Sequence, residues 1–279
     1  MIRNRAVTGR VRDSGASGSQ ASLRVSSRVH GYDVIRGLAV LSMVGFHFCY
    51  DLATLKGASI PWFIPPFQDV WRASISWTFL IVAGVMCSYS RSNLRRGVRY
   101  LVLALVIFAV TTIAAVDTPI SFGIIYCMGA STLCAWALDS VGAFPRGPRG
   151  LALSALVFAM LFVLCLGVPS GTIGFAPFGG PFLRLTRVPY DSGFLSWLGF
   201  PGPHFSSGDY YPPLPFSLLY LSGVSLGRLF RSIGTPRWLR RLSCRPIEWV
   251  GRHALPVYVL HQPILLAITL LIEASGARW

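Results

Sequence analysis

Four ionisable side chains lie in the first apolar stretch of the chain, with a spacing that places them on one side of a helix. They are Asp33, Arg36, His47 and Asp51, separated by 3, 11 and 4 residues. At 100° per residue, these spacings keep all four within about 60° of one another. An ionisable group at membrane depth costs about 2.5–3.5 kcal/mol, so such groups usually face a cavity or a partner.

The pair His47 and Asp51 has the pattern of a general base. Residues four apart are neighbours on a helix, and a carboxylate beside an imidazole orients the ring and raises its basicity. We therefore predict both as catalytic residues. Structural interpretations remain open: His47 can be a packing histidine, Asp51 can cap the helix, and Asp33 with Arg36 can form an interfacial ion pair.

A second cluster lies in the last apolar stretch, Gly251-Arg-His-Ala-Leu-Pro-Val-Tyr-Val-Leu-His-Gln-Pro263. We predict His261 as a third catalytic residue, with an interhelical hydrogen bond as the alternative. Arg252 is a candidate for binding an anionic cofactor, or else a membrane anchor. Tyr126, in another apolar run, can offer its hydroxyl to a cofactor cavity or pack in the core. Pro256 and Pro263 predict a bend in the last helix, because each removes a backbone donor.

Seven apolar stretches are long enough to position these side chains in a membrane. The segment 169–211, with many Gly and Pro, is too irregular to span lipid alone, and we expect it at the interface or folded over a cavity. The sequence thus predicts an all-α, polytopic transmembrane bundle of about seven spans at 34–54, 73–90, 99–116, 120–139, 150–168, 212–231 and 250–273.

Composition supports a membrane protein. Of 279 residues, 53% are hydrophobic and 13% charged, against about 25% charged in soluble domains. Mean hydropathy is +0.57. These values exclude an ordinary soluble enzyme, a disulfide-rich secreted domain and a disordered chain. No HExxH, Cys/His pairing or dense carboxylate cluster indicates a metal, and no P-loop or GxGxxG indicates a nucleotide fold.

The net charge of +15 is explained by membrane topology, because the basic residues fall between the apolar runs. We therefore expect no nucleic-acid partner. With the N-terminus cytoplasmic, 20 of the 25 basic residues lie on the inner side and 5 on the outer. Residues 1–30, rich in Arg, Ser and Gly, are expected to form a disordered basic cytoplasmic tail. Residues 31–279 then form the membrane domain, and we expect a multi-pass protein of a bacterial inner membrane.

Several short blocks occur in order along the chain. The first is Asp33-Val-Ile-Arg-Gly-Leu-Ala39, followed by Met43 and His47-Phe-Cys-Tyr-Asp-Leu52. The later blocks are Phe79-Leu-Ile-Val-Ala-Gly84 with Ser88, Phe122-Gly-Ile-Ile-Tyr126, Asp209-Tyr-Tyr-Pro-Pro-Leu-Pro215, Leu226-Gly-Arg228 and Gly251-Arg-His-Ala-Leu-Pro-Val-Tyr-Val-Leu-His-Gln262. Together these blocks, over about 33–265, resemble the catalytic domain family of heparan-alpha-glucosaminide N-acetyltransferases.

The resemblance implies a membrane acyltransferase that takes acetyl from cytoplasmic acetyl-CoA and delivers it to an amino sugar on the far side. The chain lacks the extra helices and luminal domain of the lysosomal enzymes, and their reactive histidine has no matching residue here. The role of His47 as base therefore rests on its own position, and acetylation of His47 itself is an alternative.

For the donor, the resemblance and the charge pattern together make Asp33, Arg36, Arg252 and Tyr126 the candidate acetyl-CoA-binding residues, since guanidinium groups pair well with phosphates. His261 can stabilise the developing oxyanion or contact the acceptor. The expected partners are the lipid bilayer, acetyl-CoA and a glycan or amine acceptor, and homo-oligomerisation stays open. Two other functions compete: a small-solute or proton-coupled transporter, because buried His and Asp also relay protons, and a membrane scaffold without catalysis.

Overall fold

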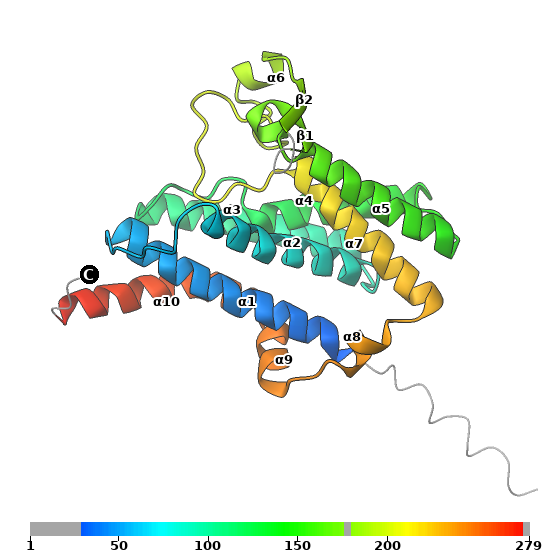
Figure 1. The fold of residues 1–279 in the computed structure, drawn as a ribbon, viewed down its shortest axis with the longest axis horizontal. Coiled ribbons are helices and arrows are strands. Elements are labelled where there is room, and N and C mark those ends of the chain that lie inside the picture. Colours follow the sequence, from blue (N-terminus) through cyan, green and yellow to red (C-terminus); the bar gives the residue numbers. More distant parts are fainter. Residues whose placement is uncertain (1–28, 176–179, 276–279) are drawn as a thin grey trace, which may run out of the picture.

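The computed structural model describes residues 29–175 and 180–275, and within them seven helices of 17–22 residues form a bundle (Figure 1). These helices occupy the seven predicted ranges. They are α1 (His30–Tyr50), α2 (Phe67–Cys87), α3 (Asn93–Ala114), α4 (Ile124–Ser140), α5 (Pro148–Cys165), α7 (Pro213–Ile233) and α10 (Ala254–Ala274). The predicted all-α, polytopic fold is confirmed, while all but the last two residues of the predicted tail lie outside the described residues.

Five helical segments are long and apolar enough to cross a membrane by length and composition, among the residues that the structure describes. They are His30–Leu55, Phe67–Cys87, Asn93–Ala114, Pro148–Ser170 and Ala254–Ala274. The other two predicted spans are different in kind. Helix α4 has only 17 residues, and α7 buries a nearly continuous run of residues, including serines and glycines, against its neighbours. A helix that faces protein rather than lipid need not be apolar all round.

Helix α7 lies at the centre and packs against α2, α4 and α5, while α3 packs on α4. Small residues let α7 and α2 approach closely: a methyl group at Gly84 would overlap the carbonyl oxygen of Tyr220, and one at Gly223 would overlap that of Ile81. Large apolar side chains such as Leu80, Phe162 and Tyr220 fill the space around these contacts and are almost fully buried. This part of the bundle is a rigid, close-packed scaffold.

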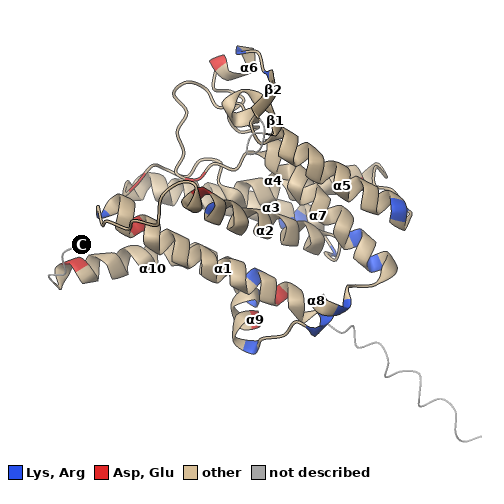
Figure 2. Cartoon of the chain, viewed as in Figure 1, with Lys and Arg blue, Asp and Glu red and all other residues tan. Residues whose placement is uncertain are grey.

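Helix α1 joins that scaffold to the last part of the chain. It packs against α2 on one side and, on the other, against α9 (Arg245–Arg252) near its beginning and α10 near its end. Helix α1 continues into η1 (Asp51–Leu55), a π-helical turn. Such turns occur frequently at functional sites. Charged residues lie mostly toward the ends of the long helices, whose middles are largely uncharged (Figure 2).

The predicted last span, 250–273, is interrupted. Helix α9 ends at Arg252, the backbone of His253 leaves the helical region at φ −102° and ψ 22°, and α10 begins at Ala254. Pro256 lies in the first turn of α10, where its missing N–H costs little. Pro263 lies inside α10 as predicted.

The segment between α5 and α7 is mostly irregular and leaves the end of α5 (Figure 1). Two antiparallel strands, β1 (Thr172–Phe175) and β2 (Gly180–Arg184), follow the short turn η2 (Val168–Ser170). The short helix α6 (Val188–Asp191) comes next, and α8 (Arg237–Arg241) later links α7 to α9.

Candidate functional site

Helices α1 and α10 bring together two of the sequence clusters at one contact. The rings of His47 and His261 have centroids 4.8 Å apart, at an interplanar angle of 57°. Beside them, the side-chain amide of Gln262 donates a hydrogen bond of 2.8 Å to Oδ1 of Asp51. We call these four residues the histidine cluster. All three predicted catalytic residues therefore lie in one place.

The hydrogen bond of His261 defines which ring nitrogen is available. Its Nδ1 faces the backbone carbonyl of Tyr258. A carbonyl only accepts, so Nδ1 carries the proton, and in the neutral ring Nε2 keeps its lone pair. That Nε2 is buried and has no hydrogen-bond partner among the described residues. It is therefore a buried proton acceptor that no described residue uses.

Two further atoms of the histidine cluster share this state. Oδ2 of Asp51 and Oε1 of Gln262 are buried and, within the described parts of the chain, unpaired. Asp51 itself is fully buried. Buried polar groups are nearly always hydrogen-bonded, so three acceptors at one contact that are unpaired among the described residues make this contact a candidate site.

The partner of Asp51 differs from the sequence expectation. We predicted that Asp51 orients His47 four residues earlier, but its hydrogen bond goes to Gln262 on the facing helix, and His47 lies against His261. His47 of α1 and Asp51 of η1 thus lie at the same contact, but each meets a residue of α10.

Tyr126 lies near the same cluster rather than near the arginines. It lines a small hollow of about 10 Å³ that Tyr258 also lines, and the Tyr258 ring is 5.6 Å from that of His261. A hollow of this size holds about one water molecule. In space, Tyr258 thus connects Tyr126 to the histidine cluster.

Asp209 lies in the irregular segment between α6 and α7, and its side chain contacts the beginning of α4. Its Oδ2 accepts a hydrogen bond of 3.1 Å from the backbone N–H of Ile124, at the beginning of α4. Burial raises the pKa of Asp209 to about 6, against the lowering effects of that hydrogen bond and of Arg72. A carboxyl group at this position caps the first turn of α4, which carries Tyr126.

The other predicted binding residues lie near the beginning of α1. Asp33 and Arg36 form the predicted ion pair, at 3.5 Å, and the Arg36 guanidinium also donates to the carbonyl oxygen of Gly251, at 3.4 Å. That bond joins α1 to the residue before Arg252, whose side chain is exposed. Asp33, Arg36 and Arg252 therefore share one region, at the opposite end of α1 from the histidine cluster.

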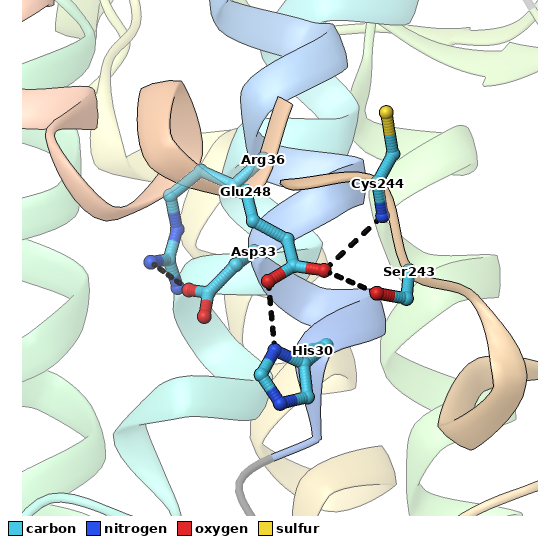
Figure 3. Close-up of polar contacts among 6 residues, drawn as sticks. All are labelled: His30, Asp33, Arg36, Ser243, Cys244 and Glu248. Atoms are coloured by element: carbon cyan, nitrogen blue, oxygen red, sulfur yellow. Dashed lines mark hydrogen bonds and ion pairs between the residues drawn. The ribbon is translucent and has the colours of Figure 1, made fainter. Parts of the chain in front are cut away.

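A buried glutamate beside this region had no role in the sequence analysis. Glu248 of α9 is 4% exposed. Its carboxylate accepts hydrogen bonds from the Ser243 hydroxyl at 2.7 Å and the Cys244 backbone N–H at 3.1 Å, and lies 2.8 Å from Nδ1 of His30 (Figure 3). The Ser243 and His30 hydrogen bonds lower its pKa, with smaller effects from the His30 charge and the Cys244 N–H. We call these four residues the glutamate clamp.

The sequence signals for the missed residues differ in strength. Glu248 is the one acid within the arginine-rich segment 237–252, which is a usable hint of a buried counter-ion. His30 lay in the predicted tail and gave no signal, although it begins α1. Gln262 follows His261 in the last apolar stretch, but nothing in the sequence pairs it with Asp51.

Comparison with known proteins gives one result. A family model described as "Heparan-alpha-glucosaminide N-acetyltransferase, catalytic" matches residues 28–263. No curated protein matches the chain, and no solved structure does. The match covers both clusters and every long helix except the end of α10, and it supports a membrane acetyltransferase function in general terms. The chain is a multi-pass membrane protein that belongs to the heparan-alpha-glucosaminide N-acetyltransferase catalytic family.

Proposed function

We propose that the protein transfers an acetyl group from acetyl-CoA to an amine-bearing acceptor, such as an amino sugar of the cell envelope, at the histidine cluster. The proposal rests on one observation above all: His47 and His261 face each other across α1 and α10, and Nε2 of His261 is buried with an unused lone pair. A base for an attacking amine needs such a nitrogen. The donor is cytoplasmic, and the acceptor lies on the other side of a bacterial inner membrane.

The residues present suit a thioester donor with an anionic end. Arg36 and Arg252 supply guanidinium groups for phosphates. Asp33 fixes Arg36 through their ion pair, and Tyr126 offers a hydroxyl near the histidine cluster. In the histidine cluster, Nε2 of His261, Oδ2 of Asp51 and Oε1 of Gln262 are unpaired among the described residues, and each can accept a hydrogen bond from an amine N–H. Acetyl-CoA supplies the activated acyl group in this chemistry.

The protein's part in the reaction is to move a proton. As the acceptor nitrogen forms its bond to the acyl carbon and the carbon–sulfur bond breaks, an imidazole of the histidine cluster takes the proton that the nitrogen loses. The thiolate leaves and is protonated afterwards. His47 is only partly buried, so it is the ring that meets the acceptor. His261 lies behind it, and Asp51 with Gln262 supports the charge that develops.

Two histidine variants test the proposal. The protein in nanodiscs is given acetyl-labelled acetyl-CoA and glucosamine. Loss of a general base lowers the rate by about 10²–10⁴-fold, so we expect His47→Gln to fall in that range. We expect His261→Gln, which changes the ring behind His47, to lower the rate by less. The exposed loop variant His204→Gln is the matched control and keeps full activity. Near-normal transfer by His47→Gln, in a correctly folded protein, would remove His47 from the mechanism.

The same preparation separates the alternatives. Label that stays on the protein when the acceptor is omitted, and is lost in His47→Gln, indicates an acetylated histidine rather than direct transfer. Amine uptake into proteoliposomes without acetyl-CoA would instead indicate a transporter. Full activity in both histidine variants would indicate that the polar cluster only joins helices.

A further inference from the structure

A cleft of about 530 Å³ lies between the loop after α4 and the last turns of α7, on elements that the proposed function does not use. Small-molecule sites commonly enclose about 300–1,000 Å³. Among its lining residues are Asp139, Phe144, Arg146, Arg228, Arg231 and Ser232. The cleft thus has the size of a ligand site and a lining rich in arginine.

Arg228 is held in a fixed position within this cleft. Its guanidinium forms an ion pair with Asp139 at 2.6 Å and lies over the buried ring of Phe144, 4.3 Å from the ring centroid. Its Nε is buried and, in the described part of the chain, makes no hydrogen bond. An unfilled donor on an otherwise immobilised arginine indicates that a further acceptor binds there.

Two more arginines line the same cleft. Arg231 is anchored by a hydrogen bond of 2.5 Å to the carbonyl oxygen of Ser88, and Arg146 is exposed on the loop. Three arginines against one aspartate give the lining a net charge of +2. The first turn of α5 also borders the cleft through Leu151, and the beginning of a helix favours anions. Figure 2 shows basic positions near the end of α7 and the beginning of α5.

We propose that this cleft binds a phosphate-bearing ligand of nucleotide or lipid-headgroup size. The planar fork of a guanidinium matches the oxygens of a phosphate, and several forks around one cavity are typical of phosphate recognition. The cleft is built by α4, α5 and α7, whereas the histidine cluster is built by α1 and α10. The inference is therefore separate from the proposed function and concerns binding alone.

Binding of two probes tests the cleft and identifies the source of the phosphate. Adenosine diphosphate is titrated into the protein in phosphatidylcholine nanodiscs, and retention of phosphatidylglycerol is measured in mixed nanodiscs by native mass spectrometry. We expect Arg146→Gln and Arg231→Gln each to weaken binding of the favoured probe by about 3–10-fold, since each removes a charge-assisted contact. Asp139→Asn should tighten binding, because it removes a competing acid.

Arg149→Gln is the matched control, since Arg149 is exposed on the same helix end but outside the lining. It should leave binding unchanged. Nucleotide binding that follows the cleft variants supports a soluble ligand, and lipid retention that follows them supports a headgroup. If neither probe binds, or if Arg149→Gln weakens binding as much as Arg146→Gln does, the proposal is overturned. Arg146 makes the test robust, because it is exposed and its replacement should not affect folding.

Discussion

The two ends of helix α1 carry polar clusters of opposite character. In the glutamate clamp, the Glu248 carboxylate accepts two hydrogen bonds, from Ser243 and Cys244, and pairs with His30. In the histidine cluster, one hydrogen bond joins Asp51 to Gln262, and three buried acceptor atoms have no partner in the described structure. The same helix thus has a satisfied polar cluster near its beginning and an unsatisfied one just past its end.

We expect this difference to separate stability from function. A satisfied buried network fastens elements, here α1 to α9, because breaking it would leave polar groups unpaired. An unsatisfied one costs folding free energy and persists where a ligand completes it. Variants in the glutamate clamp should therefore lower stability and spare transfer, whereas variants in the histidine cluster should lower transfer and spare stability.

Asp51→Asn should give the largest effect that separates the two clusters. Asparagine keeps the shape and can still accept from Gln262, but it cannot carry the negative charge that supports a protonated imidazole. We expect transfer to fall about 10–100-fold, which corresponds to about 1.4–2.7 kcal/mol of transition-state stabilisation, with little change in Tm. Acetyl transfer and thermal unfolding of the same preparation provide the measurement.

The exposed Asp191→Asn is the control for a lost carboxylate, and it should change neither quantity. If Asp51→Asn lowered Tm while transfer stayed intact, the histidine cluster would be a structural contact like the glutamate clamp, and the comparison would fail.

Gly251→Ala tests the packing that holds the first end of α1. A methyl group at this position would overlap the carbonyl oxygen of Asp33, so α9 must move away from α1. Overpacking of this kind costs about 1–3 kcal/mol, and we expect a lower Tm. Gly45→Ala on α1 is the matched control, because its methyl group would lie 3.7 Å from the Trp71 ring, an ordinary contact. Equal Tm values for the two variants would show that α9 does not pack closely against α1.

The sequence predicted the helices and one polar face well, because both follow from local periodicity. Asp33, Arg36, His47 and Asp51 were expected on one face, and the structure turns that face toward α9 and α10. The meeting of Asp51 with Gln262 could not be predicted. It joins residues 211 positions apart, and which residues of two helices meet depends on how the whole bundle packs.

The glutamate clamp shows the same limit more strongly. His30 and Glu248 are 218 positions apart, and His30 lies where composition indicated a disordered tail. The break at His253 was also missed, because the predicted span began at residue 250, before Arg252 and His253, and only the backbone of one residue leaves the helical region. Patterns along the chain reveal elements and faces, whereas contacts between distant elements require the fold.

Acid should weaken the glutamate clamp in a way that the Glu248→Gln variant does not share. The folded-state pKa of Glu248 is lowered from 4.5 by its hydrogen bonds from Ser243 and His30. A carboxylate with a lowered pKa stabilises the fold above pH 4.5, and that contribution is lost as the pH falls through the lower folded-state value. At pH 7 we expect Glu248→Gln to unfold about 2–4 °C below the wild type, with the gap closing in acid. Asp69→Asn, which breaks an exposed ion pair with Arg72, should show almost no Tm difference from the wild type at either pH.

A Tm difference for Glu248→Gln that stays constant from neutral pH into acid would mean that the Glu248 charge does not hold α9 to α1. The contrast between the two ends of α1 would then rest on packing alone.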